Sequence, residues 1–458
     1  MRQIDHFIVG DTPTSSNSSG RKHQIWNPST GEVQAEVALG DAALLARAVE
    51  TAKRVQPAWA ATNPQRRARV MFAFKELVEA NMQSLAEMLS SEHGKTVPDA
   101  RGDVQRGLEV IEYACGLPQI MKGEYTHGAG PGIDVYSMRQ PLGIGAGITP
   151  FNFPAMIPMW MFGMACAAGN AFILKPSERD PSVPVRLAEL FLEAGAPEGL
   201  LQVVHGDKEM VDAIIDQPDI AAISFVGSSD IAQYIYARGS ANNKRVQAFG
   251  GAKNHGIVLP DADLDQVVTD LTGAAFGSAG ERCMALPVVV PVGEDTADAL
   301  REKLIPAINA LRVGISTDPD AHYGPVVTAQ HKARVEGWIE RGSEVSSFYD
   351  PMLAKVISWA PTRERAVARM RRALGYSFGV KVWGPGLCEL FNYLFGTLLR
   401  GAPKPQAHLA YCGAKLAIGQ QALQLRPIVG LAPHHLGAVL DQDSLGRIFK
   451  DDVGIGVA

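Results

Sequence analysis

An α/β fold with a parallel sheet is predicted for this chain from two observations. Short apolar segments recur at 143–148, 172–174, 201–205, 222–225 and 246–249, and longer segments separate them. Strands that alternate with helices in this way form parallel βαβ units. Such a sheet binds a dinucleotide at the carboxyl ends of its strands. The length of 458 residues leaves room for two or three domains.

Helices are predicted on the N-terminal side of this sheet. Residues 42–60 have apolar side chains at helical spacing, and they follow Gly40-Asp41, which supplies an N-cap. Residues 65–89 and 103–117 are predicted as two further long amphipathic helices. Residues 125–140 have strand-like side chains around three glycines, which predicts a projecting arm or hairpin.

A second, smaller α/β segment is predicted after the sheet. It comprises a strand at 256–259, a helix at 265–275, a strand at 286–292 and a helix at 329–340. We therefore divide the chain into four parts, listed here. Residues 1–118 and 142–250 form the dinucleotide-binding domain, 119–141 an arm, 251–342 a second domain, and 343–458 an atypical C-terminal segment.

The composition excludes several classes of partner. A formal charge of −5 leaves no basic surface for nucleic acid. Five scattered cysteines without a CxxC pattern argue for a reducing compartment and against a metal site. The N-terminus has neither a signal core nor an Arg-rich presequence, so we expect a cytoplasmic protein. Residues 154–174 lack charge, but their prolines and glycines favour a buried helix at 156–168 over a membrane span.

Two residues have the chemistry of covalent catalysis. Cys283 follows glycines and small residues, which leave room for a substrate carbonyl, and Arg282 beside it favours the thiolate. A lone cysteine is more often a small buried hydrophobic residue. Asn152 lies between Phe151 and Phe153, where it serves as an oxyanion donor, a turn residue or a satisfied buried amide. These alternatives remain open from the residues alone.

Four motifs in order resemble those of the aldehyde dehydrogenase superfamily. They are Pro150-Phe151-Asn152-Phe153-Pro154, Phe225-Val226-Gly227-Ser228, Gly250-Gly251-Ala252-Lys253-Asn254-His255 and Glu281-Arg282-Cys283-Met284-Ala285-Leu286. The resemblance covers residues 5–342 and is greatest to the CoA-acylating methylmalonate-semialdehyde dehydrogenases. It implies an aldehyde-dehydrogenase-like fold, with a Rossmann-type parallel sheet and a truncated α/β catalytic domain. It also implies that Cys283 is the nucleophile and Asn152 the oxyanion donor.

The resemblance implies NAD as the cofactor. Lys175 and Glu178 correspond to positions that contact the adenosine ribose, where the carboxylate would repel a 2′-phosphate. Ser177 with nearby acids also fits a helix-capping pattern. Gly227 and Ser228 resemble the phosphate-side turn. Thr149 and Phe151 complete the cofactor-binding set that the resemblance implies.

The family comparison also implies the fate of the acyl group. Hydrolytic relatives have a glutamate where this chain has Ala248. Water needs such a base, whereas a thiol with a pKa of about 8.5 attacks unaided. The missing glutamate favours transfer to coenzyme A as co-substrate. A hydrolytic enzyme with a displaced base and an inactive relative are the alternatives.

The substrate that the resemblance implies is a small semialdehyde with a carboxylate. Arg106 and Arg282 are predicted to bind that carboxylate, because guanidinium groups pair with carboxylates through two hydrogen bonds. After oxidation, the β-carboxy thioester would lose CO2. For Arg106 a solvated charge on a helix face is the alternative.

The resemblance ends near residue 342. No Glu-Glu-Ile-Phe-Gly-Pro segment follows, and the closing and oligomerisation strands of the family are not recognisable. Residues 346–374 instead resemble a strand and helix from the C-terminal part of biotin carboxylases. A chimeric or truncated gene, with impaired catalysis, is therefore an alternative. The family implies a homo-oligomer.

Overall fold

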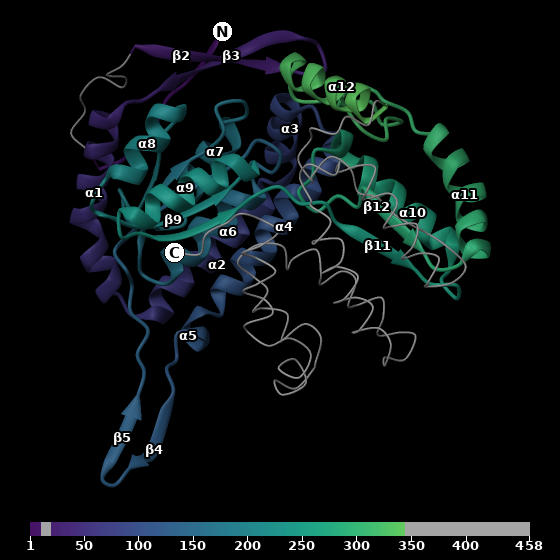
Figure 1. Cartoon of the computed structure of the whole chain (residues 1–458). Helices are drawn as coiled ribbons and strands as arrows, with labels where there is room; N and C mark the ends of the chain where they lie inside the picture. The colour runs from purple at the N-terminus through teal and green to yellow at the C-terminus, as the bar shows by residue number, and fades with distance from the viewer. Residues whose placement is uncertain (11–19, 344–458) are drawn as a thin grey trace, which may run out of the picture. The chain divides into compact units, whose positions relative to one another are not determined.

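The computed structural model describes residues 1–10 and 20–343 (Figure 1). The strands are β1 (Arg2–Ile4), β2 (Arg21–Asn27), β3 (Glu32–Leu39), β4 (Tyr125–Gly130), β5 (Ile133–Tyr136), β6 (Ile144–Ile148), β7 (Ala171–Lys175), β8 (Leu201–Val203), β9 (Ile220–Val226), β10 (Arg245–Phe249), β11 (His255–Val258) and β12 (Val288–Pro291). The helices are α1 (Ala42–Ala61), α2 (Pro64–Ala80), α3 (Met82–His93), α4 (Val97–Cys115), α5 (Leu117–Ile120), α6 (Met156–Ala167), α7 (Ser182–Glu193), α8 (Lys208–Asp216), α9 (Ser229–Ala241), α10 (Leu264–Phe276), α11 (Glu294–Asn309) and α12 (Ala329–Ser343), with a 3₁₀ helix η1 (Gly277–Gly280).

The central sheet confirms the predicted α/β fold. Its five strands are all parallel, in the order β10-β9-β6-β7-β8. Ala146 of β6 lies opposite Ile173 of β7 on one side and Ile223 of β9 on the other. Every residue of β7 is buried, as expected for a parallel strand that is covered on both faces. The strand order reverses at β6, and sheets of this kind bind ligands at the carboxyl edge beside such a reversal.

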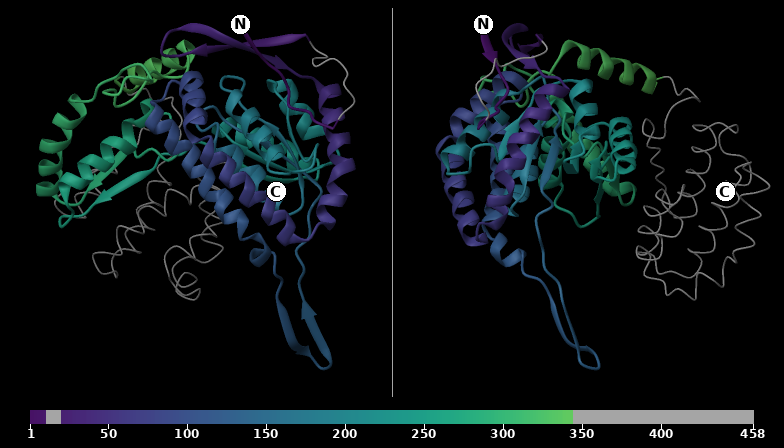
Figure 2. Two further views of the ribbon diagram at one scale, coloured as in Figure 1. Left: turned by 180° about the vertical axis from the view of Figure 1, so that it is seen from behind. Right: turned by 90° about the vertical axis from the view of Figure 1, so that its left-hand side faces the viewer.

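Helices cover both faces of the sheet. Right-handed crossovers place α6 and α7 on one face and α8 and α9 on the other. Helices α2 and α4 pack on α6, and α1 packs on α8 and on β6 to β8 (Figure 2). Phe74, Phe162 and Phe191 form a ring cluster with centroids 5.2 to 5.8 Å apart. The sheet and the helices on its two faces together form one large apolar core.

Two N-terminal predictions need correction. The helix expected at 65–89 is two helices, α2 and α3, which break at Asn81. The Asn81 amide donates to the Leu77 carbonyl at 2.8 Å, so it competes with the helical hydrogen bonds. Helix α4 begins at Val97, six residues before the predicted start, because Pro98 is tolerated in a first helical turn.

The arm and an additional sheet lie outside the main core. Strands β4 and β5 form the predicted hairpin, which projects from the molecule in all views (Figures 1 and 2). Its apolar side chains are exposed, including Tyr136 at 66%. The sequence did not predict the sheet β1-β3-β2, in which β2 and β3 are antiparallel. Their mixture of charged and apolar residues was not recognised as strand-forming.

The segment after Gly251 has a smaller core. Strands β11 and β12 pair in parallel, and α10 and α11 pack beside them. Four buried residues form this core: Val258, Val268, Leu271 and Leu300. The predicted elements at 256–259, 265–275, 286–292 and 329–340 are confirmed as β11, α10, β12 and α12, with small shifts at their ends.

Some predictions fall beyond these residues. The segment at 346–374, and everything else predicted for 344–458, lies outside the described residues. The division into domains at 118, 142, 250 and 342 remains a prediction. Within residues 1–10 and 20–343, no helix combines the length and the apolar character that crossing a membrane requires.

Candidate active site

The predicted site residues of the first domain come together at the switch in strand order. Thr149, Phe151 and Asn152 follow β6, and Lys175 ends β7. Gly227 and Ser228 follow β9, which is the neighbour of β6 on its other side. Parallel strands present their carboxyl ends at one edge, so these side chains share that edge.

The nucleophile segment reaches the same region through a left-handed turn. After α10, Ser278, Ala279 and Gly280 have φ values of 55°, 53° and 76°. Side chains with a Cβ atom rarely adopt this conformation, and each such residue costs about 1–3 kcal/mol. We call Gly277 to Met284 the nucleophile loop. Cys283, near the end of this loop, lies beside the segment that follows β6.

Asn152 joins the two loops directly. Its side-chain Nδ2 donates to the backbone carbonyl of Glu281 at 3.0 Å. The backbone carbonyl of Asn152 accepts from Lys95 Nζ at 2.7 Å. Lys95 is buried and pairs with buried Asp103 at 3.3 Å. Asp103 accepts from the Met156 N–H at 2.8 Å. An amide nitrogen has two hydrogens, so one N–H of Asn152 remains for a substrate oxygen.

Cys283 lies half-buried against the start of α6. It packs on an apolar cluster of Phe153, Met156 and Ile157. Asn254 Nδ2 donates to its carbonyl at 3.1 Å and thereby ties the loop to the strand that begins at His255. Burial raises the pKa of the Cys283 thiol, whereas backbone N–H groups and Lys95 lower it. The geometry therefore supports the predicted pairing of Cys283 and Asn152.

The two predicted carboxylate-binding arginines differ in their surroundings. Arg282 pairs with Asp99 at 2.6 Å and donates to the Gly273 carbonyl at 3.2 Å. Arg106 is exposed, and its guanidinium makes no ion pair with the described part of the chain. Its carbonyl accepts from Trp160 Nε1 at 3.2 Å. No contact among the described residues joins either guanidinium to Cys283 or Asn152.

A buried polar cluster lies beneath the nucleophile loop, and sequence reasoning missed it. The Glu281 side chain is 4% exposed, and its carboxyl group lies near His93 and His331. Both imidazole rings also pack against Phe151, with centroids 5.8 and 5.7 Å away. Glu92, His93 and Lys95 at the end of α3 are buried as well, and nothing in their polar sequence distinguishes them from solvated residues.

The cofactor edge has a carboxylate and unpaired polar groups. Lys175 Nζ lies 3.1 Å from Glu178 Oε2. Burial opposes ionisation of Glu178, but Lys175 and a backbone N–H hold its pKa below the ordinary value. Thr149 Oγ1 is buried and has no partner within the described residues. Ser228 is the N-cap of α9 and makes no side-chain hydrogen bond to that helix, and the start of a helix is a typical place for an anion.

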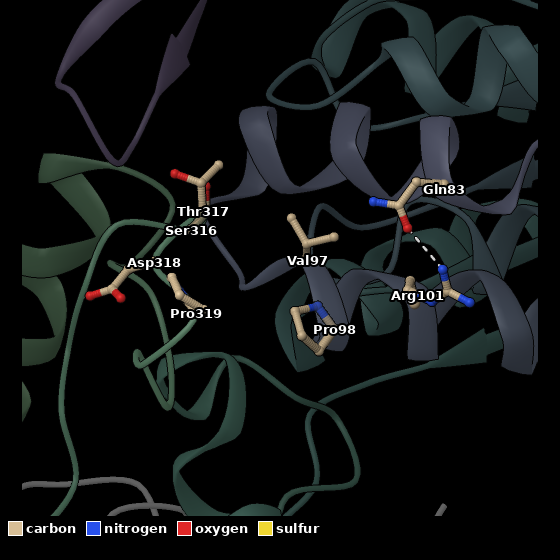
Figure 3. A pocket seen from close by; sticks show the side chains of 8 residues that line it. All are labelled: Gln83, Val97, Pro98, Arg101, Ser316, Thr317, Asp318 and Pro319. Carbon is tan, nitrogen blue, oxygen red and sulfur yellow. Dashed lines mark hydrogen bonds between the residues drawn. The ribbon is translucent and has the colours of Figure 1, made fainter.

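A cavity of about 450 Å³ lies away from these residues (Figure 3). Its walls are Gln83 of α3, the start of α4 at 97–101, and the segment 316–319. Arg101 Nη1 donates to Gln83 Oε1 at 2.8 Å across one side. Neither Cys283 nor Asn152 lines this cavity, so we do not assign it to the catalytic centre. Over the residues that the structure covers, no cluster of three or more His, Cys, Asp or Glu side chains could hold a metal ion.

The fold and this site define the class of the protein. The model of the aldehyde dehydrogenase family matches residues 14–347, and the chain belongs to that family. It is thus an oxidoreductase that acts on aldehydes. A second model, the biotin carboxylase C-terminal domain, matches residues 322–381 and overlaps the end of the first match. Both predicted resemblances are confirmed.

Several relatives of this chain are named as semialdehyde dehydrogenases. A malonate-semialdehyde dehydrogenase of Pseudomonas aeruginosa is 53% identical over 342 residues, which are 75% of this chain and 68% of the relative. An acylating mitochondrial methylmalonate-semialdehyde dehydrogenase of Arabidopsis thaliana is 48% identical, over 73% of this chain and 55% of the relative.

Solved structures agree with these relatives. The methylmalonate-semialdehyde dehydrogenase of Oceanimonas doudoroffii has a TM-score of 0.72 and 51% identity. A Sinorhizobium meliloti 1021 protein, solved in complex with NAD, has a TM-score of 0.72 and 62% identity. Each match covers 75% of this chain and 70% of the solved one.

Proposed function

We propose that this chain oxidises malonate or methylmalonate semialdehyde with NAD and transfers the acyl group to coenzyme A with loss of CO2. The hydrogen bond from Asn152 to the Glu281 carbonyl carries this proposal. It fixes an oxyanion donor next to the loop that bears Cys283. The names of the relatives from Pseudomonas aeruginosa and Arabidopsis thaliana support the substrate class.

Covalent catalysis would begin at the Cys283 thiolate. The sulfur attacks the aldehyde carbon, and the carbonyl oxygen becomes an alkoxide. The free N–H of Asn152 stabilises this charge, and the apolar cluster of Phe153, Met156 and Ile157 restricts access of water on one side. NAD, when bound, accepts the hydride from the thiohemiacetal carbon. The product on Cys283 is a thioester.

Residues at the cofactor edge fit a dinucleotide. Glu178 is a carboxylate near neutral pH and accepts from ribose hydroxyl groups, while Lys175 holds it in place. The start of α9, where the Ser228 side chain makes no capping hydrogen bond, suits a pyrophosphate. The N–H of Gly227 donates to the Phe249 carbonyl at 3.1 Å, so Gly227 would contribute its lack of a side chain and not a donor. Thr149 Oγ1 and Phe151 complete the edge. The NAD complex of the Sinorhizobium meliloti protein supports the same cofactor.

The carboxylate of the substrate would be held by Arg106 and Arg282. Arg282 is oriented by Asp99, and Arg106 has no competing acid in the described chain. Once the aldehyde is oxidised, the β-carboxylate leaves as CO2 and the electron pair of the broken C–C bond forms a thioester enolate. Protonation of the enolate gives the shorter acyl-enzyme.

Release to coenzyme A follows from Ala248. This residue lies in β10 and has no acid–base group, so it cannot activate water. The thiolate of coenzyme A needs no such base, attacks the thioester carbonyl and regenerates the Cys283 thiolate. The experiment is a single-turnover measurement of acyl release with and without coenzyme A. We expect faster release with the thiol, and equal rates would favour the hydrolytic alternative.

The exposed hairpin is proposed to join copies of this chain. Tyr125, Ile133, Val135, Tyr136 and Met138 are each more than half exposed. Apolar side chains on a projecting hairpin are typical of surfaces that another chain covers. Sedimentation of the full chain tests this proposal, since Tyr136→Ser should shift the mass toward the monomer.

A further inference from the structure

Glu281 contacts three separate parts of the molecule. It lies two residues before Cys283, and its carbonyl accepts from Asn152 after β6. Its Oε1 accepts from the Val327 N–H at 3.3 Å and lies 3.1 Å from His331 Nε2 at the start of α12. Its Oε2 lies 4.0 Å from His93 Nε2 at the end of α3. One side chain therefore connects the nucleophile loop with residues 327–331.

The carboxyl group is better suited to the neutral form than to the charged one. Glu281 Oε2 is buried and has no hydrogen-bond partner in the described residues. Both ring nitrogens of His93 are also buried and unpaired there. A charged oxygen without a donor costs more than a neutral one. Ionisation would therefore draw water or His93 toward Oε2 and strain the loop.

Among the buried groups in this cluster, Glu281 is the one expected to change charge near neutral pH. Burial raises the pKa of Glu281 to about 7, while the Val327 N–H and the cations Lys95, Arg179 and Arg334 oppose that rise. Burial lowers the pKa of His331 to about 4 and that of His93 well below its ordinary value. Both imidazoles are thus neutral when Glu281 titrates.

We infer that Glu281 is a positioning residue, whose neutral carboxyl group anchors the nucleophile loop to residues 327–331 and so fixes Asn152 and Cys283 in register. In this form an O–H of the carboxyl group donates to His331 while the same oxygen accepts from Val327. Loss of the proton weakens the anchor, and the loop moves relative to Asn152. The inference rests on the proposed function for its effect on turnover, but its effect on the thiol does not need a substrate.

The first test is the pH profile of Cys283 alkylation in the full chain. Iodoacetamide is the probe, peptide mass spectrometry assigns the modified cysteine, and Cys283→Ser gives the background. We expect the parent rate to show a step near pH 7 in addition to the ionisation of the thiol. Glu281→Gln keeps an acceptor oxygen but cannot ionise, so its profile should lack that step. The control is Glu302, an exposed acid on α11, and the Glu302→Gln variant should retain the step near pH 7.

The second test is turnover of malonate semialdehyde. Glu281→Ala removes the anchor, and displacement of the loop should lower kcat by roughly tenfold to a hundredfold with little change in KM. Glu281→Gln should retain more activity than Glu281→Ala. A general loss of stability would lower the melting temperature without altering the pH profile of the thiol. If Glu281→Ala does not fold, the alkylation profile of the isosteric Glu281→Gln variant still tests the positioning role of Glu281.

The outcomes separate this inference from the proposed function. A step near pH 7 that persists in Glu281→Gln would overturn the positioning role, whatever the enzyme oxidises. A chain that fails to oxidise semialdehydes but shows the expected alkylation profiles would retain the positioning role and lose the proposed function. An Ala variant with the parent profile and the parent kcat would also overturn the inference.

Discussion

Asn152 and Cys283, the two residues of the proposed catalytic pair, lie in regions of very different packing. Asn152 follows β6 in the centre of a five-stranded sheet with a large core. Cys283 lies between α10 and β12, beside a two-stranded sheet with four buried apolar residues in its core. In that second region even the large apolar residues Ile257 and Leu259 are 56% and 53% exposed, so its core is small. The proposed nucleophile therefore lies in the region with the smaller core, whereas the proposed oxyanion donor lies in the region with the larger one.

The largest expected effect comes from removing the thiol of Cys283. Cys283→Ala should abolish turnover, because only the thiolate forms the covalent adduct, and loss of a nucleophile costs on the order of 10⁶-fold in kcat. Binding of NAD should persist, since the cofactor edge belongs to the five-stranded sheet. NADH absorbance measures turnover and calorimetry measures binding. Measurable steady turnover in the variant would reject Cys283 as the nucleophile.

Matched leucine truncations compare the two cores directly. Leu174→Ala, at a residue that is 0% exposed in β7, should lower the free energy of unfolding by about 3–5 kcal/mol. Leu271→Ala, at 6% exposure in α10, should cost about 2–3 kcal/mol because its neighbourhood can collapse. Urea denaturation followed by circular dichroism gives both values. Equal losses would show that the second region is as well packed as the first.

The pH dependence of stability isolates the nucleophile loop. Because burial raises the pKa of folded Glu281 from 4.5 to about 7, the folded state favours the protonated acid. This contribution is complete below about pH 4.5 and is lost as the pH rises through 7, a change of about 3 kcal/mol. The histidines oppose it, so the quantity to measure is the difference between the parent and Glu281→Gln across pH 5 to 8. A constant difference would contradict the shift.

The smallest effect concerns substrate choice. Arg106→Leu should weaken kcat/KM for malonate semialdehyde by roughly tenfold to a hundredfold, or about 1.5–3 kcal/mol, because a charge-assisted contact is lost. Propanal, which has no carboxylate, serves as the matched substrate and should be affected much less. A uniform loss for both substrates would assign Arg106 a structural role.

Much of the first region was predictable because its signals are local. Apolar runs such as Ala171 to Lys175 indicate buried parallel strands without any knowledge of their neighbours. The break at Asn81 was missed, since a polar residue in an amphipathic pattern does not show where its amide will bond. The sheet of β1 to β3 was missed because β2 and β3 mix charged with apolar residues, so no apolar run marks them as strands.

The candidate site was predictable where a motif carried the chemistry. Cys283 and Asn152 were predicted through the family resemblance of their motifs, and the structure places their loops in contact. Their catalytic roles stay predictions. Lys95, Asp103 and Glu281 were not identified, because a buried polar side chain resembles a solvated one in the sequence. Their roles depend on tertiary contacts, which periodicity does not report.

The left-handed turn at Ser278 and Ala279 has a consequence for conformational freedom. Glycine would occupy these φ values without strain, but it would also give the loop many more conformations. Side chains with a Cβ atom remove most of those alternatives, at a cost to folding of about 1–3 kcal/mol per residue. The chain thereby narrows the ensemble of the loop that holds Cys283 before any substrate arrives. This local restriction of the backbone thus adds to the hydrogen bonds from Asn152 and Asn254 in holding the loop of Cys283 in place.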